Sequence, residues 1–314
     1  MPTIAPAADA AYNVAMKTLA IIGQSASGKT SAAHNIARET NAALLSMDSL
    51  SVYRHIDVAS AKPTEAERDG LTYFGLDIAD PRDRFGADEF IAEFLRAKAF
   101  CEETDRDLII VGGSGFYLKA ITSGLSPIPA IDAEIKAKVL TALNDLSAAY
   151  NELKTIDPIC AAKIAPKDRY RIEKALLIAY AGGKTPSAWF AAHPPRAILQ
   201  NAPIAVLTIP VETLRAKIAL RTKKMLADGL IDEVENLLTN APRSAQPMKA
   251  IGVKETIDYI DGKISVAELE NLINIHTSQF AKRQRVYNNG RFDEIVRLSA
   301  DEIETFGLRY FGQS

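Results

Sequence analysis

The segment that most constrains the fold of this 314-residue chain is Gly23–Thr30, which reads Gly-Gln-Ser-Ala-Ser-Gly-Lys-Thr. It fits the pattern G-x-x-x-x-G-K-[ST], in which glycines let backbone N–H groups turn toward a bound anion. The apolar run at 19–22 predicts a strand before the loop, and 31–40 predicts a helix after it. Because a strand and a helix flank the pattern on the correct sides, we expect a di- or triphosphate site rather than a chance glycine-rich turn.

Within this phosphate loop, the side chains of Lys29 and Thr30 have separate roles. Lys29 adds a full positive charge to the partial charge of the helix N-terminus, and the Thr30 hydroxyl is the expected protein ligand of Mg²⁺. The pattern does not identify the ligand as ATP. The residues expected to hold the phosphates are Gly23, Gln24, Ser25, Ala26, Ser27, Gly28, Lys29 and Thr30.

A carboxylate follows the second predicted strand. The apolar run at 42–47 ends in Asp48-Ser49. Ligands of open α/β sheets bind outside the carboxyl ends of the strands, so we expect Asp48 to face the phosphate site, one strand away. Asp48 could accept a proton from an incoming nucleophile or hold Mg²⁺ through water. The alternative is an aspartate that only caps a helix or closes a turn.

The strand expected at 107–111 ends without a carboxylate. It runs into Gly112-Gly113-Ser114-Gly115-Phe116-Tyr117, whereas a P-loop NTPase places an acid there to organise Mg²⁺ and the attacking group. This weakens the ATPase interpretation. The small residues predict an open turn with room for a flat or bulky substrate, and the alternative is a tight turn in which Ser114 caps the next helix.

Composition and charge narrow the class of protein. The chain is 47% hydrophobic and 24% charged, which is typical of a soluble globular protein. Its net charge of -2 argues against nonspecific electrostatic binding of nucleic acid over the whole surface, but it is compatible with a local basic face. No stretch approaches the ~18 apolar residues that a membrane span needs.

Cys101 and Cys160 lack metal-binding spacing, so we expect buried or half-buried thiols and a cytoplasmic location. The histidines, which also lack metal spacing, are His34, His55, His193 and His276.

Strands and helices alternate through the first 125 residues, which predicts an α/β fold: a P-loop NTPase-like parallel sheet with flanking helices. From about 131 the apolar residues recur only at helical spacing, and a strand returns at 203–209 after Pro194-Pro195. We therefore expect an inserted all-helical lobe. The expected domains are a disordered tail at 1–16, with Met16 as a candidate start, a core at 17–130 and 197–314, and the inserted lobe at 131–196. Later elements are expected as helices at 213–228, up to 238 and at 266–289, and a strand at 294–298.

Several further motifs occur in a fixed order along nearly the whole chain. They are the segments Asp48–Arg54, Asp57–Thr64, Val111–Ala120, Asp157-Pro158, Asp168–Ile172, Ala250–Glu255 and Ala281–Gln284. With the phosphate loop, they resemble the tRNA dimethylallyltransferases, also called isopentenyl-tRNA transferases. The chain departs from the family pattern at Ser51, Ser60-Ala61, Ser114, Lys136, Val253 and Ser278.

The resemblance implies transfer of a dimethylallyl group from dimethylallyl diphosphate to N6 of adenosine 37 in tRNA, with Mg²⁺ as cofactor. The implied partner is the anticodon stem-loop of tRNA, and we expect a cytoplasmic monomer. The implied catalytic residues are Asp48, Lys29, Ser114 and Lys136. The implied tRNA contacts are Asp48, Ser49, Leu50, Ser51, Ser114, Lys136, Tyr170, Arg171, Lys174, Lys249, Lys254, Lys282, Arg283, Gln284 and Arg285. For the basic residues the alternative is a solvated charged face.

Three other functions stay open at this point. A P-loop small-molecule kinase would transfer phosphate from ATP, with Asp48 activating a hydroxyl, and would need no basic lobe. A prenyltransferase acting on free AMP, ADP or ATP would lack the helical insert and the basic helix near 282–285. A nucleotide-gated RNA-binding protein would use the phosphate loop only to sense its ligand.

Overall fold

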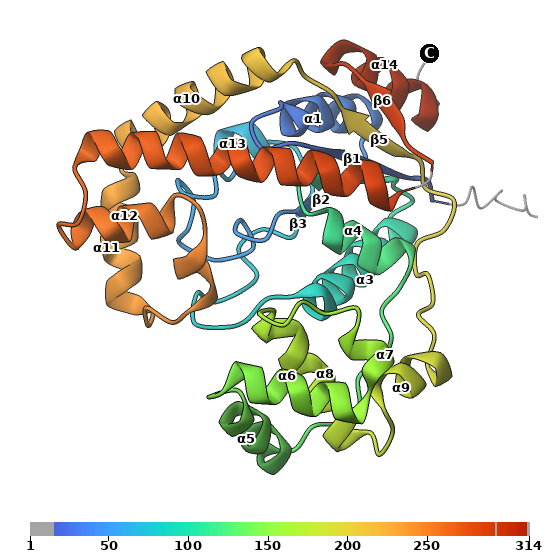
Figure 1. The fold of residues 1–314 in the computed structure, drawn as a ribbon. Coiled ribbons are helices and arrows are strands. Elements are labelled where there is room, and N and C mark those ends of the chain that lie inside the picture. The colour runs from blue at the N-terminus through green and yellow to red at the C-terminus, as the bar shows by residue number, and fades with distance from the viewer. Residues whose placement is uncertain (1–15, 293, 313–314) are drawn as a thin grey trace, which may run out of the picture. The chain divides into compact units, whose positions relative to one another are not determined.

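The computed structural model describes residues 16–292 and 294–312. Apart from Met16, the tail expected at 1–16 lies outside the described residues. One parallel sheet with the strand order β3-β2-β4-β1-β5-β6 forms the core, which confirms the expected P-loop-like α/β class (Figure 1). The strands are β1 (Thr18–Gly23), β2 (Ala43–Met47), β3 (Tyr73–Phe74), β4 (Leu108–Gly112), β5 (Ile204–Leu207) and β6 (Val296–Leu298).

The central strands form from continuous apolar runs because helices cover both faces of a parallel sheet. Residues 19–22 of β1 are fully buried. Alternate side chains point to opposite faces, and Leu19 and Ile21 pack with α1 and with Ile303 of α14. Figure 1 shows α1 and α14 on one side of the sheet and α3 on the other.

The first compact unit comprises the described residues of 16–119 and 201–312. Its long helices α10 and α13 lie side by side (Figure 1). α13 begins at a capping box formed by Ser265 and Glu268, which satisfies two free backbone donors at its start. The helices of this part are α1 (Lys29–Thr40), α2 (Glu65–Arg68), α3 (Ala87–Glu103), α10 (Val211–Ala227), α11 (Leu230–Asn240), the 3₁₀ helix η1 (Gln246–Lys249), α12 (Val253–Ile260), α13 (Val266–Arg291) and α14 (Ala300–Phe311), and α4 (Gly115–Thr122) begins in this unit and ends in the next.

The second compact unit, Ala120–Gln200, contains the helices expected for the insert. Its core gathers Val139, Leu153, Ile172 and Leu176 from three helices. An aspartate or threonine side chain accepts a hydrogen bond from a free backbone N–H at the start of each helix. These caps stabilise the helix starts, so a new helix can begin after each turn. The helices are α5 (Ala133–Ala142), α6 (Leu146–Ile156), α7 (Pro158–Ala161), α8 (Arg169–Ala181) and α9 (Pro186–Ala192).

The cysteines are free thiols, as expected, with Cys101 buried and Cys160 half-buried. Burial raises the pKa of Cys101 to about 11, so this thiol is not a poised nucleophile. Within the described residues, no helix has the length and apolar character needed to cross a membrane.

Candidate functional site

The phosphate loop follows β1 directly and leads into α1. Gly28 has φ +101°, a left-handed conformation that suits glycine, and the backbone then enters the helix at Lys29. The loop is tightened by a bond from the Ser27 N–H to the Gln24 carbonyl (3.2 Å). The Ser27 hydroxyl is buried without a hydrogen-bond partner. An unsatisfied donor inside this loop fits a site for an anion.

Lys29 points back over the loop, where its Nζ donates to the Gln24 carbonyl (3.2 Å). Burial lowers the pKa of Lys29 to about 8; the nearby Asp48 carboxylate opposes this shift and the Arg221 guanidinium adds to it. A cation that is partly deprived of water is a strong partner for a phosphate, because the ligand replaces the lost solvation.

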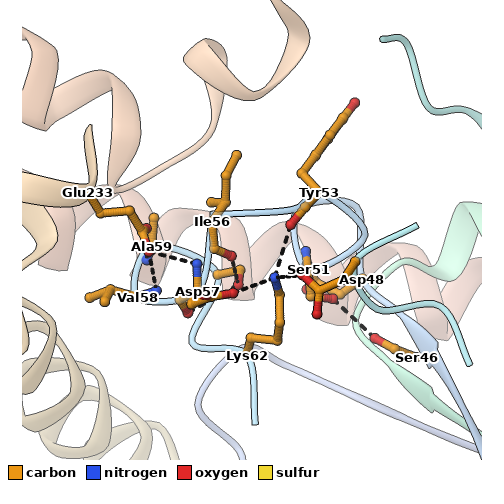
Figure 2. Close-up of polar contacts among 12 residues, drawn as sticks. Ser46, Asp48, Ser51, Tyr53, Ile56, Asp57, Val58, Ala59, Lys62 and Glu233 are labelled. Atoms are coloured by element: carbon orange, nitrogen blue, oxygen red, sulfur yellow. Dashed lines mark hydrogen bonds and ion pairs between the residues drawn. The ribbon is translucent and has the colours of Figure 1, made fainter. Parts of the chain in front are cut away.

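Asp48 follows β2 at the same edge of the sheet, with β4 between β2 and β1. Its Oδ1 accepts the backbone N–H groups of Leu50 (2.8 Å) and Ser51 (3.1 Å). Figure 2 shows Asp48 beside Ser51. The carboxylate therefore closes a turn, as the alternative interpretation expected, and it also lines the cavity described below. The turn fixes the direction of the side chain, so the two interpretations are compatible.

The glycines after β4 permit close packing. A side chain at Gly112 would collide with the Met47 carbonyl, and one at Gly113 would overlap the Gln284 amide. Gln284 itself donates from Nε2 to the Gly113 carbonyl (3.0 Å) and accepts the Ser25 N–H through Oε1 (2.8 Å). Gln284 therefore ties the phosphate loop to the turn after β4. The turn is less open than the sequence predicted, although Ser114 still borders the cavity.

A cavity of about 490 Å³ lies against these loops within the first unit. This volume is within the usual range of ~300–1,000 Å³ for small-molecule sites. One part of the wall is polar and holds Asp48, Ser114 and the cation Arg221. The apolar part is formed by Ile218, Met225, Ile251, Ile273 and Phe280. A site with an anion-binding end and an apolar wall is suited to a ligand that combines phosphate with hydrocarbon.

Arg221 is a site residue that the sequence analysis missed. It lies on α10, lines the cavity, and donates from Nη2 to the Ser60 carbonyl (3.2 Å). Burial lowers the pKa of Arg221, and the charge of the Asp48 carboxylate, which lines the same cavity, opposes this shift. The buried spacing of Leu214, Ile218 and Met225 on the same helix is the signal that could have placed Arg221 toward the interior.

The donor set is compatible with Mg²⁺. Thr30 lies in the first turn of α1, and the Asp48 carboxylate acts by its charge on the preceding residue, Lys29. Mg²⁺ is typically held by one or two protein oxygens together with substrate phosphates and water. Among the described residues there is no group of three or more His, Cys, Asp or Glu side chains arranged around a metal.

The other expected tRNA contacts of the first unit divide into three groups. Ser49, Leu50, Lys249 and Arg283 line the cavity. The side chains of Ser51 and Gln284 are buried and hydrogen-bonded to protein partners, Ser51 to the Ser46 hydroxyl (3.1 Å), and Gln284 also lines the cavity. The exposed basic residues that do not border the cavity are Lys254, Lys282 and Arg285.

The remaining expected residues lie in the second unit. Lys136 is exposed on α5. Tyr170, Arg171 and Lys174 lie near the start of α8 and border a separate cavity of about 700 Å³. Tyr170 is 59% exposed, and the centre of its ring lies 5.6 Å from the Lys174 ammonium. An exposed aromatic ring beside cations is a suitable surface for a nucleobase and its phosphate.

Comparison with known proteins points to one family. A sequence profile described as IPP transferase matches residues 51–291. The tRNA dimethylallyltransferase of Sulfurimonas denitrificans is 43% identical over 289 residues, covering 92% of this chain and 97% of that protein. The tRNA dimethylallyltransferase of Helicobacter pylori strain 26695 is 39% identical over 294 residues, covering 94% of each.

Two solved structures share the fold. The full-length tRNA isopentenylpyrophosphate transferase of Bacillus halodurans superposes with a TM-score of 0.68 at 28% identity, covering 95% of this chain and 97% of that one. A eukaryotic dimethylallyltransferase acting on tRNA superposes with a TM-score of 0.79 at 23% identity, covering 91% of this chain and 74% of that one. At that identity the second likeness supports the fold alone.

Proposed function

Because this chain belongs to the IPP transferase family, we propose that it transfers a dimethylallyl group from dimethylallyl diphosphate to N6 of adenosine 37 in tRNA. The products are N6-dimethylallyladenosine and diphosphate. The expected acceptor is the anticodon stem-loop, and the expected cofactor is Mg²⁺. We further propose that the protein acts in the cytoplasm as a monomer.

The observation that carries the proposal is the mixed cavity beside the phosphate loop. Lys29 and the loop amides supply the anion site, and Ile218, Ile251 and Ile273 supply an apolar wall for the five-carbon group. A kinase would need room for a nucleoside and an acid to organise attack on phosphorus. β4 ends in Gly112 with no such acid, which fits a diphosphate that leaves intact.

In the proposed reaction the N6 amine attacks the allylic carbon, the C–O bond to diphosphate breaks, and the N6 proton passes to Asp48. Lys29, Arg221 and the loop N–H groups stabilise the charge that grows on the leaving diphosphate. When bound through Thr30, Mg²⁺ would neutralise part of the same charge. The turn that fixes Asp48 holds its carboxylate ready for the proton.

The acceptor base cannot react while it is stacked in the anticodon loop. It must be extruded into the cavity, which costs a few kcal/mol of unstacking. Ser49, Ser114 and Phe116 border the cavity, and Phe116 is 54% exposed. We expect these residues to receive the base, and we expect the exposed basic residues to hold the surrounding phosphates. In this scheme Gln284 and Ser51 support the site from within, because their polar groups are bonded to protein.

The decisive experiment incubates the protein with labelled dimethylallyl diphosphate, Mg²⁺ and bulk tRNA, followed by digestion to nucleosides. Label in N6-modified adenosine is the expected result. A parallel reaction uses ATP labelled in its γ-phosphate and a set of hydroxyl acceptors. Transfer of that phosphate, with no prenylated adenosine, would overturn the proposal in favour of a kinase.

The lowered pKa of Lys29 predicts a pH dependence of kcat/KM for the donor. The side chain is charged below a pKa of about 8 and neutral above it, so donor capture should fall above pH 8 by up to tenfold per pH unit. An unperturbed lysine would keep its charge to about pH 10. Lys29→Arg should remove the alkaline decline, because a guanidinium stays protonated. A wild-type profile that is flat to pH 9.5 would contradict this assignment.

The proposed phosphate contacts predict a change in salt dependence. Lys282→Ala should weaken tRNA binding and reduce the slope of log K against log salt by about 0.7 to 0.9, as expected for one lost phosphate contact. Filter binding between 50 and 200 mM salt measures the slope. The control is Lys98→Ala, since Lys98 is paired with Glu102 on α3 (2.8 Å). If both variants keep the wild-type slope, Lys282 belongs to a solvated face.

A further inference from the structure

The loop that carries Asp48 is held by contacts from elsewhere in the chain. We call residues 48–62 the site loop. It is built of turns, with one isolated bridge from Tyr53 to Ala79, and it contributes cavity-lining residues at both ends, Asp48 at the start and Ser60 near the finish. A segment without regular structure needs other bonds to fix its shape.

One carboxylate supplies three of these bonds. Glu233 of α11 accepts the backbone N–H groups of Asp57 (2.7 Å), Val58 (2.7 Å) and Ala59 (2.8 Å) (Figure 2). Three successive N–H groups that converge on one anion form a nest, and bonds to a carboxylate are stronger than neutral ones. Glu233 also lies in the first turn of its helix, where the helix dipole favours a negative charge.

A second connection runs from the same nest toward Asp48. The Asp57 carboxylate binds the Lys62 ammonium (2.5 Å), whose side chain is 2% exposed. Lys62 also binds Asp77 (2.5 Å) and donates to the Tyr53 carbonyl (2.9 Å). Tyr53 lies two residues beyond Ser51, whose N–H is bound by Asp48. The nest is thus linked through Asp57 and Lys62 to the turn that holds the proposed proton acceptor.

The residue that follows the nest is hydrogen-bonded to Arg221. Ala59 is bound by Glu233, and the next residue, Ser60, accepts a bond from Arg221 through its carbonyl (3.2 Å). A shift of 57–60 would therefore move both the carbonyl that orients Arg221 and the wall of the cavity. The phosphate loop at 23–30 is a separate segment and does not contact Glu233 through any of these bonds.

We propose that Glu233 is a positioning residue of the transferase site: its carboxylate fixes residues 57–60 so that Asp48 and Arg221 meet the reacting groups. This inference rests on the proposed function. It predicts that Glu233→Gln, in which an amide NH₂ replaces one acceptor oxygen and faces backbone donors, lowers kcat by about 10- to 100-fold. The KM for dimethylallyl diphosphate should change less than about threefold, since the phosphate loop keeps its shape.

The matched control is Glu235→Gln, an exposed position on the same helix with the same change of charge. Its kcat should stay within about twofold of wild type. A Glu233→Gln variant that matches this control would overturn the proposal. Equal losses in kcat and donor affinity would also overturn it, because they indicate general damage to the fold.

Amide hydrogen exchange on the wild-type protein gives a test that needs no variant. The N–H groups of Asp57, Val58 and Ala59 should exchange slowly although they lie in a loop. Rapid exchange there would overturn the role of Glu233. If wild type exchanged slowly at these positions but transferred no prenyl group, the anchoring would stand and the proposed function would fall, and with it the catalytic part of the inference.

Discussion

Replacement of Asp48 by asparagine is expected to lower the single-turnover rate of prenyl transfer by about 10²–10⁴-fold, the usual contribution of a positioned general base. The asparagine carbonyl can still accept the Leu50 and Ser51 N–H groups that Asp48 Oδ1 binds at 2.8 and 3.1 Å. The turn should therefore survive, and the lost rate should reflect proton acceptance alone. The measurement is a single-turnover assay with both substrates saturating.

The asparagine variant requires one precaution and has one clear contrary outcome. Asp48 raises the pKa of Lys29 against the effect of burial, so its removal should lower that pKa below about 8. The rates are therefore compared below pH 7, on the acidic side of the wild-type Lys29 pKa of about 8. Affinities for dimethylallyl diphosphate and tRNA should remain within about threefold of wild type. A near wild-type rate would show that Asp48 only closes its turn and is not the proton acceptor.

The sequence located the sheet and the phosphate loop because both leave local signals. Parallel strands that are covered on both faces are continuous apolar runs, and β1, β2, β4 and β5 lie within a residue or two of the expected positions. The bounds of α3 were not predicted. The buried face of α3 includes Glu93, whose carboxylate accepts the Gly75 N–H (2.7 Å) and pairs with Arg96 (2.6 Å). A buried charge in the apolar stripe hides the helical period.

The site could be only partly predicted, because contacts between distant segments leave no local pattern. The phosphate loop and Asp48 were found from short motifs. Arg221 is one of several cations on α10; the apolar spacing of that helix indicates which face is buried, but no local motif marks Arg221 as a cavity residue. Glu233 acts on residues 174 to 176 positions earlier in the chain. Gln284, which the sequence predicts as a tRNA contact, also joins Ser25 to Gly113 by hydrogen bonds and lines the cavity. In each case tertiary packing decides the role.

Replacement of Arg221 by methionine should lower kcat/KM for dimethylallyl diphosphate by about 10²–10³-fold, the loss typical of one group that stabilises developing charge. Arg221 borders the cavity together with Ile218 and Met225 of the same helix, so an apolar side chain can pack there and the fold should persist. The affinity for tRNA should change little, because the lost charge faces the diphosphate. Steady-state kinetics with the donor varied at saturating tRNA measure the effect.

Two companion variants separate the charge of Arg221 from its geometry. Arg221→Lys keeps the charge but loses the planar guanidinium that reaches the Ser60 carbonyl at 3.2 Å, so it should recover only part of the rate. Arg215→Met removes an exposed cation from the same helix and should stay near wild type. If Arg221→Met and Arg215→Met lost the same small factor, the leaving diphosphate would draw its stabilisation from the phosphate loop alone, and α10 would serve only as a wall for the prenyl group.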